Sequence, residues 1–492
     1  MHNFTLFQFF HWYYSPEGNL WQHASAESAR LSDIGVTHVW LPPAYKSALG
    51  TEEPGYAVYD LYDLGEFDQK GAIRTRYGTK EEYLACIEAF HQRNVQVLAD
   101  IVLNHKHGGD EKETFPARKV DCCNRNDFIE EESVIEAWTK FYFPARQGKY
   151  SDFVWDWKTF TGVSEDPEHI YLILNDHTNG QWEEMIEDEQ GNFDYLMGAD
   201  VEFRNPFVRD ELKTWGEWYL ETTKVDGFRL DAVKHIPYQF FNEWLDHLRQ
   251  HINKDFLCIG EYWRSHADPL HKYIEMTGGR MQLFDVPLHF NFHTASTSEN
   301  NYDMSKILDG TLMQQNPALA ITFVDNHDTQ PLQSLQSPVE QWFKPHAYAI
   351  ILLREQGLPC VFYPALYGAK YVDHKEGNEI YVELNPVYNL EKMMIVRRDL
   401  AYGIQRDYLD HPNTIGWTRE GVVEKPGSGC AVVITNGSAG HKHMEVGLQH
   451  AGKTFVDLLG HMARVLIDEN GWGEFYVNDR SASVWVVENI PG

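Results

Sequence analysis

The sequence predicts an α/β protein: a (β/α)8 TIM barrel with an inserted domain after its third strand and a C-terminal all-β domain. Strand-like and helical segments alternate along the chain, which is typical of a parallel sheet. Eight such units over roughly 400 residues favour a closed barrel. An open doubly wound sheet is the alternative, but no G-x-G-x-x-G follows the first strand.

The pattern has two breaks, and they divide the chain into three predicted domains. Residues 1–103 and 206–403 would form the barrel. Residues 104–205, rich in Trp, Asp and Gly, would form the inserted domain. Short alternating strands with Gly-rich turns begin after residue 404 and predict a β domain over 404–492.

The first barrel units are read from local spacing and from one capping motif. Thr79 and Glu82 form a capping-box pair at the start of a helix. The run VQVLADIVL is nearly all apolar, as in a strand buried on both faces of a parallel sheet. The expected strands are Thr5–Phe10, Thr37–Leu41 and Val95–Leu103, and the expected helices are Ala24–Asp33 and Thr79–Arg93.

The remaining units follow the insertion. The expected strands are Val225–Leu230, Phe256–Gly260, Gln282–Val286, Ala320–Val324 and Cys360–Tyr363. The expected helices are Pro206–Lys224, Tyr238–His251, one near Met304–Gln314, Val339–Gln356 and Leu390–Tyr402. In the β domain, Ala431–Thr435 and Ser483–Val487 are expected strands.

Charge and cysteine usage limit the partners and the compartment. The net charge of −31 repels phosphate backbones and anionic membranes, so we expect neither nucleic acid nor a membrane as partner. The six cysteines show no C-x-x-C pair, and free thiols favour a reducing compartment. The N-terminus lacks a signal-peptide pattern, although a secreted chain begun at a new methionine would share that feature. We expect a cytoplasmic monomer.

The segment Gly227–His235 concentrates charged side chains at a strand end. Arg229 and Asp231 are two residues apart, so on a strand they face the same side. A charge pair is costly to bury and is rarely there for packing alone. A structural ion pair is the alternative reading of this segment by itself.

Other strand ends carry further polar side chains toward the same barrel mouth. They are Asp100, Asn104 and His105 after strand 3, Glu261 after strand 5, and Asn326, His327 and Asp328 after strand 7. Any one of them could be a helix cap or a turn residue, and histidines beside carboxylates could hold a metal. His-x-x-x-His spacing on a helix is absent, which disfavours a catalytic zinc.

The carboxylates at the mouth fit one reaction class. Two carboxylates that flank a bond hydrolyse glycosides, and retention of configuration needs them roughly 5–5.5 Å apart. Arg229 would keep Asp231 ionised, as a nucleophile requires. Glu261 would need a raised pKa to act as an acid, and the negative charge of a nearby Asp328 could raise it.

Four short segments, in chain order, resemble the signature regions of the α-amylase family. They are DIVLNH (Asp100–His105), GFRLDAVKH (Gly227–His235), GEYW (Gly260–Trp263) and FVDNHD (Phe323–Asp328). The stretches Pro54–Lys80 and Tyr195–Phe203 look like the bacterial liquefying α-amylases and their intracellular relatives. The resemblance extends across nearly the whole chain.

The resemblance assigns roles to the matching residues. It implies that Asp231 is the nucleophile, Glu261 the general acid/base and Asp328 the carboxylate that stabilises the transition state. It implies substrate binding by Arg229, which orients the nucleophile, by His105, His327 and Tyr56 around the sugar next to the scissile bond, and by Lys234, His235 and Trp263 on the leaving-group side. The Lys-His pair after Asp231 is typical of enzymes that cut internal α-1,4 bonds.

The family also implies a structural Ca²⁺ between the inserted domain and the barrel. Asn104, Asp194, Asp200 and the backbone carbonyl of His235 match its ligand positions, and such oxygen donors suit a hard cation. Turn chemistry is the alternative reading of the two aspartates. The secreted relatives have Asp at the positions of Glu183 and Glu202, so the additional metal ions of those relatives are in doubt for this chain. Separately, Tyr363–Gly368 departs from the usual sequence of the loop after strand 8.

The implied function is retaining endo-hydrolysis of α-1,4-glucosidic bonds in starch, glycogen and maltodextrins. An α-glucan transglycosylase on the same scaffold is the main alternative, because it would use the same residues. A non-catalytic relative usually lacks one of the three carboxylates, and all three stand here. A separate polysaccharide-binding module is disfavoured because the β domain after residue 404 is short.

Overall fold

Eight short apolar strands close into a parallel barrel in the computed structural model of the protein. The structure describes residues 3–166, 169–460 and 462–488. The ring order is β1, β16, β15, β14, β13, β12, β5, β2, and every neighbouring pair is parallel. The predicted TIM barrel is confirmed. Its strands are β1 (Leu6–Gln8), β2 (His38–Leu41), β5 (Gln96–Ile101), β12 (Gly227–Leu230), β13 (Leu257–Gly260), β14 (Gln282–Phe284), β15 (Ala320–Phe323) and β16 (Leu358–Phe362).

The helices that follow these strands agree with most of the predicted segments. The Thr79/Glu82 capping box is formed at the start of α2. The barrel helices include α1 (Leu20–Asp33), α2 (Lys80–His91), α3 (Pro206–Thr223), α4 (Tyr238–His251), α8 (Lys344–Leu353) and α10 (Leu390–Asp399). The helix predicted over Val339–Gln356 is therefore shorter at both ends.

The prediction of a helix near Met304–Gln314 is wrong. The main helix here is α6 (Val286–Ser298), and only a 3-10 turn over Met304–Lys306 and the short α7 (Leu312–Gln315) follow it. Asp285 caps α6 by accepting a hydrogen bond from the backbone of Leu288, which ends the strand earlier than its apolar run suggests. Gly310, at a φ of 69°, interrupts the segment expected to be helical. Helix α5 (Ala267–Met276) was not predicted.

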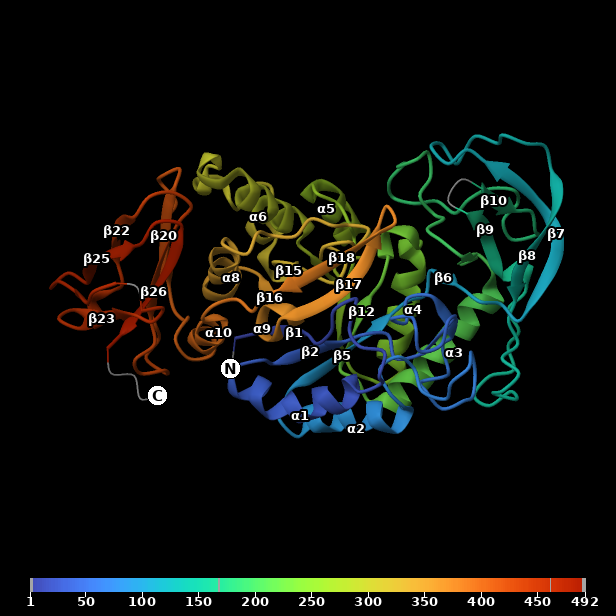
Figure 1. The fold of residues 1–492 in the computed structure, drawn as a ribbon, viewed down its shortest axis with the longest axis horizontal. Helices are drawn as coiled ribbons and strands as arrows, with labels where there is room; N and C mark the ends of the chain where they lie inside the picture. Colours follow the sequence, from blue (N-terminus) through green and yellow to red (C-terminus); the bar gives the residue numbers. More distant parts are fainter. Residues whose placement is uncertain (1–2, 167–168, 461, 489–492) are drawn as a thin grey trace.

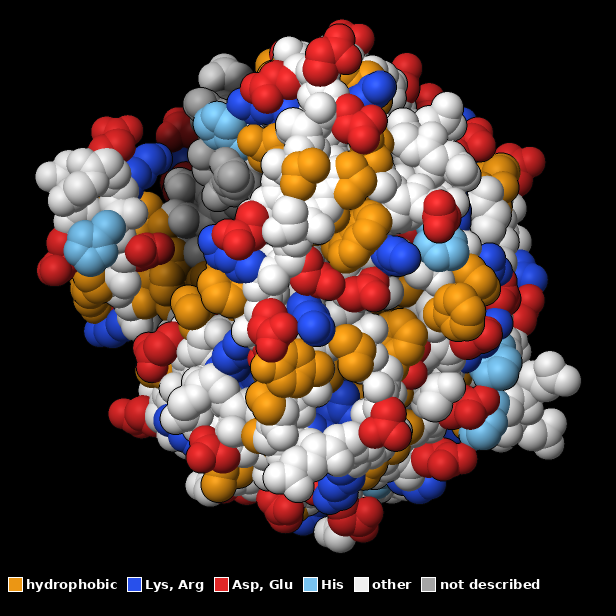
Figure 2. Space-filling view, turned by 90° about the vertical axis from the view of Figure 1, so that its right-hand side faces the viewer, with side chains coloured by type: hydrophobic (Ala, Val, Ile, Leu, Met, Phe, Trp, Pro, Cys, Tyr) orange, Lys and Arg blue, Asp and Glu red, His pale blue; other side chains and the backbone are white. Residues whose placement is uncertain are grey.

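A six-stranded antiparallel sheet is inserted after β5, the third barrel strand. It has the order β6 (His105–Lys106), β11 (Ala199–Val201), β9 (Phe160–Asp166), β10 (His169–Ile173), β7 (Glu111–Val120) and β8 (Ser133–Lys140). It lies at the right of Figure 1, beside the barrel. On the face seen in Figure 2, acidic side chains are interspersed with basic and apolar ones rather than gathered in one patch.

The C-terminal part is all β, as predicted, and lies at the left of Figure 1. One sheet has the order β19 (Gln405–Tyr408), β20 (Thr414–Arg419), β21 (Cys430–Thr435), β26 (Ser481–Val487), β23 (Thr454–Asp457) and β24 (Val465–Leu466). The pair β22 (Gly440–Glu445) and β25 (Trp472–Val477) packs against it through a separate apolar core that includes Phe455, Phe475 and Trp485.

Two smaller features complete the fold. A hairpin of β17 (Ala369–Lys375) and β18 (Asn378–Leu384) follows the short helix α9 (Tyr363–Tyr367) after β16, and β3 (Lys46–Ser47) pairs with β4 (Val58–Asp60). Cys258 and Cys360 are buried, and within the described ranges all six cysteines are free. No helix in the described part of the chain is long and apolar enough to cross a membrane.

Candidate active site

Arg229 lies at the centre of the barrel mouth and contacts three carboxylates. It is fully buried at the end of β12. Its Nη1 lies 2.5 Å from Asp231 and 2.9 Å from Asp100, and its Nη2 lies 2.9 Å from Glu261. The predicted pairing of Arg229 with Asp231 is therefore present, and one guanidinium also brings Glu261 to the same point.

Asp100 is the deepest of these carboxylates. Its second oxygen accepts hydrogen bonds from Trp40 Nε1 at 2.9 Å and from the Tyr56 hydroxyl at 2.6 Å. Burial raises the pKa of Asp100 to about 6, against the opposing effect of Arg229. The sequence indicates Asp100 at this strand end but not its bonds to Trp40, in the neighbouring strand β2, and to Tyr56, in the loop before β4.

Glu261 and Asp328 form the outer part of the mouth. The backbone amide of Ala232, held at a φ of 50°, donates to Glu261 at 3.2 Å. Burial, with the nearby charges of Asp231 and Asp328, raises the pKa of Glu261 well above its ordinary value. Burial likewise raises the pKa of Asp328 to about 7.

An aromatic wall stands beside the carboxylates. The Tyr56 and His327 rings stack at 5.0 Å, and Trp12 stacks on both, at 5.6 Å and 6.1 Å. A His105 ring nitrogen bonds the Tyr56 carbonyl at 2.9 Å. Burial holds the pKa of His327 well below its usual value, so this imidazole is neutral. Trp12 had not been singled out from the sequence.

Three more of the predicted site residues follow Asp231 or Glu261 in the chain: Lys234, His235 and Trp263. The first two contact the inserted segment. The Lys234 ammonium pairs with Glu189 and lies 4.6 Å from the Phe193 ring. His235 bonds the Phe193 carbonyl at 2.7 Å. Trp263 packs within 6.3 Å of His289 and Phe323 in the barrel.

Glu189 extends these contacts into a chain of ion pairs that the sequence did not predict. It also pairs with Arg264 at 2.9 Å, and Arg264 pairs with Glu187 at 2.9 Å. The chain joins loops after β12 and β13 to the inserted segment.

Buried oxygen atoms cluster where the inserted sheet meets the barrel. Asn104 donates to Asp200 at 3.1 Å, and Asp194 accepts from the backbone of Glu183 at 2.9 Å. Among the described residues, Asn104 Oδ1, Asp200 Oδ2 and both Glu183 carboxylate oxygens have no hydrogen-bond donor. Burial and mutual repulsion raise the pKa of Asp194 to about 7 and those of Asp200 and Glu183 well above normal. Unpaired buried oxygens of this kind fit a hard cation.

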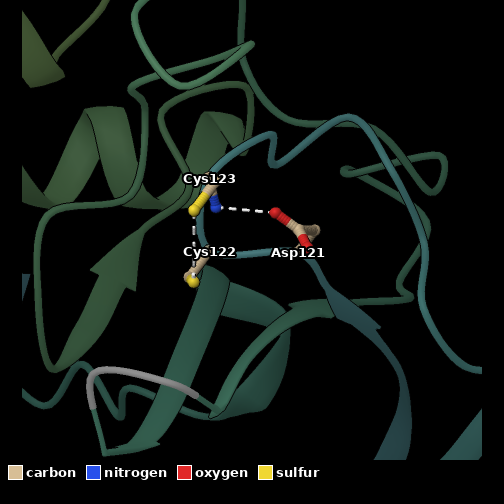
Figure 3. Close-up of side chains that lie close together, drawn as sticks. All are labelled: Asp121, Cys122 and Cys123. Carbon is tan, nitrogen blue, oxygen red and sulfur yellow. Dashed lines mark hydrogen bonds between the residues drawn. The ribbon is translucent and has the colours of Figure 1, made fainter.

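A different group has closely spaced metal-ligand atoms. Within the described ranges, Asp121, Cys122 and Cys123 are the one set of three His, Cys, Asp or Glu residues whose ligand atoms lie within 4.8 Å of one another. Figure 3 shows them on a turn of the inserted segment, with the two sulfurs 3.8 Å apart and the Cys123 amide donating to Asp121 at 2.7 Å. Both thiols are exposed, and the group is separate from the predicted calcium ligands.

Comparison with known families identifies the scaffold. Residues 29–381 match the family described as "Alpha amylase, catalytic domain", and residues 430–486 match "Alpha-amylase C-terminal". The chain belongs to the α-amylase family. It is thus a glycoside hydrolase by family, as the four sequence segments implied.

Curated relatives of this α-amylase family member match it along nearly its whole length. It is 47% identical to the cytoplasmic alpha-amylase of Escherichia coli (strain K12), over 100% of both chains. It is 50% identical to the alpha-amylase of Geobacillus stearothermophilus, covering 98% of this chain and 87% of the relative. The alpha-amylase of Bacillus licheniformis is 45% identical, over 98% and 93%.

Solved structures with low sequence identity share the fold. An alpha-amylase from Geobacillus thermoleovorans complexed with acarbose aligns with a TM-score of 0.63 at 17% identity, covering 99% of each chain. A three-domain cyclomaltodextrin glucanotransferase aligns with a TM-score of 0.64 at 19% identity, covering 100% of each. At these identities the likeness concerns the fold alone.

Proposed function

We propose that this enzyme is an α-amylase that cleaves internal α-1,4-glucosidic bonds of starch, glycogen and maltodextrins with retention of configuration. The observation that carries the proposal is the Arg229 guanidinium, which holds Asp231 and Glu261 at one point of the mouth. Relatives named α-amylase, at 45–50% identity, support the activity.

In the first step, Asp231 is the nucleophile. Its carboxylate is held in place by the ion pair with the Arg229 guanidinium. The Asp231 carboxylate attacks the anomeric carbon while Glu261, protonated because of its raised pKa, gives its proton to the glycosidic oxygen. The glycosidic bond breaks, the leaving chain departs with that proton, and a glycosyl ester forms on Asp231.

In the second step, Glu261 acts as a base. It takes a proton from a water molecule whose oxygen attacks the anomeric carbon and releases Asp231. Two inversions at one carbon return the original configuration. Asp328 stabilises the positive charge that develops on the sugar in both transition states.

The surrounding residues would position the glucan. Tyr56, with His105 and His327, forms the wall beside the reacting sugar, and its stacked rings suit the flat apolar face of a glucose unit. Lys234, His235 and Trp263 would contact the leaving-group sugars.

We also propose that Asn104, Asp194, Asp200 and the His235 carbonyl hold a Ca²⁺ ion. The buried oxygens without hydrogen-bond donors support this ligand set. The ion would supply positive charge that joins the inserted segment to the barrel, and it would take no part in bond cleavage. Glu183 adds two more unpaired oxygens beside this set, so its carboxylate is a further candidate ligand.

We propose that this protein is cytoplasmic, on two grounds. A relative at 47% identity is named a cytoplasmic alpha-amylase. The six cysteines are free throughout the described structure, as expected in a reducing compartment. The monomeric state remains a prediction.

Substitution of Glu261 tests the mechanism. Glu261→Gln keeps the shape of the side chain but removes the acid, so hydrolysis of starch should fall on the order of 10²–10⁴-fold. Maltooligosaccharide binding, measured by calorimetry, should change little. Glu81→Gln, on an exposed face of α2, is the matched control and should be fully active. Near-normal hydrolysis by Glu261→Gln would refute the assignment.

The products from maltoheptaose separate hydrolysis from transfer. Hydrolysis yields only shorter maltooligosaccharides, whereas a transglycosylase also yields longer ones. Longer products in large amount would favour the alternative function on the same residues.

A further inference from the structure

The β17–β18 hairpin stands at the mouth of the barrel, directly after its eighth strand. Its strands pair from Ala369 with Leu384 to Lys375 with Asn378. Glu376 and Gly377 join them, both with positive φ (52° and 79°), which suits a tight two-residue turn. In Figure 1 it is drawn in orange across the barrel. Segments that leave the carboxyl ends of barrel strands build the substrate site in this fold.

The inner face of the hairpin is fastened to loops from two neighbouring barrel strands. The Tyr371 ring stacks on Tyr13 at 3.9 Å and 10°, and the Tyr13 hydroxyl donates to Asp373. Gln333 donates to the Tyr13 hydroxyl at 2.8 Å, and the Tyr371 hydroxyl donates to the Pro331 carbonyl at 2.9 Å. The loops after β1 and β15 therefore hold the hairpin in one position.

The same loop after β1 also builds the wall of the candidate active site. Trp12 precedes Tyr13 and stacks on Tyr56 and His327. Its backbone amide donates a hydrogen bond to the side-chain oxygen of Gln330 at 3.1 Å. The hairpin and the residues beside the reacting sugar thus share the support of residues 12 and 13.

The strand order shows which side of the mouth the hairpin occupies. In the ring β1, β16, β15, β14, β13, β12, β5, β2, strand β16 stands four places from β12, directly across the barrel. Lys234 follows β12 and is fastened to Glu189 of the inserted segment. The hairpin and Lys234 therefore lie on opposite sides of the mouth.

We propose that the β17–β18 hairpin is a wall of the substrate cleft on its glycone side, and that Tyr13 and Asp373 position it. This inference rests on the proposed function, which assigns the leaving-group sugars to the Lys234 side. The wall limits and holds the sugars that remain attached to the enzyme after cleavage, and it thereby influences product length. Its ligand is the non-reducing part of an α-1,4-glucan chain.

A shortened hairpin tests the proposal. Residues 372–381 are replaced by Asn-Gly, which joins Tyr371 to Val382, its partner across the hairpin. The substrate is maltoheptaose labelled at its reducing end, so the labelled fragment counts the sugars on the leaving-group side. Loss of glycone contacts moves the substrate toward the leaving-group side, and the labelled fragments become longer. A change of about two- to tenfold in the ratio of fragments corresponds to loss of one aromatic contact.

Matched variants separate this effect from a loss of stability. Lys234→Met weakens the opposite side and should shift the labelled fragments toward shorter lengths. Lys370→Ala combined with Glu383→Ala removes an exposed ion pair on the hairpin and should leave the ratio unchanged. If the shortened protein does not fold, Asp373→Asn and Tyr371→Leu provide the same readout, with a smaller shift in the same direction.

The outcomes are distinct from those that test the proposed function. A wild-type fragment ratio in every folded hairpin variant, or a shift toward shorter labelled fragments, overturns the glycone wall while leaving the mechanism intact. Full activity of Glu261→Gln would instead refute the mechanism itself. A lower melting temperature with an unchanged ratio identifies the hairpin as purely structural.

Discussion

Two acidic clusters in this enzyme differ in how their charge is balanced. The mouth cluster comprises the buried Asp100, Asp231 and Glu261 with the partly buried Asp328, and the insert cluster comprises the buried Glu183, Asp194, Asp200 and Glu202. Arg229 lies inside the mouth cluster and contacts three of its four carboxylates. The fold therefore provides its own counter-charge there.

The insert cluster has two arginines beside it, Arg204 and Arg125. Arg204 pairs with Glu202 at 2.6 Å but remains one-third exposed, and it comes no closer than 3.7 Å to Glu183. The charge of the buried Arg125 opposes the rise in the pKa of Asp194 and Asp200, but its side chain donates its hydrogen bond to the Tyr195 carbonyl. Asp200 and Glu183 have buried oxygens without hydrogen-bond donors, which is costly, so the proposed Ca²⁺ would complete this cluster. The mouth cluster, by contrast, already contains its cation.

The largest expected difference between the clusters is in activity. Asp231→Asn removes the proposed nucleophile, and kcat/KM on starch should fall on the order of 10⁴-fold or more. Asp194→Asn, the corresponding change in the insert cluster, should keep most of its activity at saturating calcium. Equal losses in the two variants would show that the clusters do not have separate roles.

The next difference concerns stability. Arg229→Met would leave three buried carboxylates without their cation, so the free energy of unfolding should fall by about 3–5 kcal/mol. Calcium should not restore it, because the ion would bind the other cluster. Urea denaturation measures the change, and Arg30→Met, in an exposed ion pair, is a control expected to lose less than about 1 kcal/mol. A calcium-rescued Arg229→Met protein would contradict the comparison.

Local sequence patterns were sufficient for most of the barrel. Helix α4 begins and ends where predicted because Phe241, Trp244, Leu245 and Leu248 follow helical spacing after a proline. Helix α6 was missed because its first residues continue the apolar run of β14, and only the cap by Asp285 separates the two. The hairpin has a local sequence signal, because alternating residues flank Glu376-Gly377.

For the candidate site, the sequence could supply residue types at strand ends but not contacts between segments that are far apart in the chain. The bonds of Trp40 and Tyr56 to Asp100 join residues 60 and 44 positions apart. Lys234 and Glu189 are 45 positions apart. Such pairs depend on which strands become neighbours and on how loops fold back over the barrel, and no local pattern in the sequence contains this information.

A smaller effect is expected from calcium removal. A ligand present at 100 times its Kd stabilises the folded state by about 2.7 kcal/mol, so exhaustive chelation should lower the melting temperature measurably. Asp200→Asn should abolish this response, because it alters an oxygen donor that lacks a partner in the described structure. Asp231→Asn should keep the response. An unchanged melting temperature and activity after chelation would remove the calcium proposal.

The subtlest test concerns the pH dependence of hydrolysis. The pKa of Glu261 is raised by burial, by Asp231 and by Asp328, and the proposed acid works only while protonated. Activity should therefore decline as the pH rises through this pKa. Asp328→Asn removes one negative neighbour, which lowers the pKa of Glu261 and moves the alkaline limb of kcat/KM to lower pH. The limb is measured with a nitrophenyl maltooligosaccharide as the substrate. Asp200→Asn removes a charge from the insert cluster and should leave the alkaline limb in place. An equal displacement in both variants would mean that charges of the insert cluster act on Glu261 as strongly as Asp328 does.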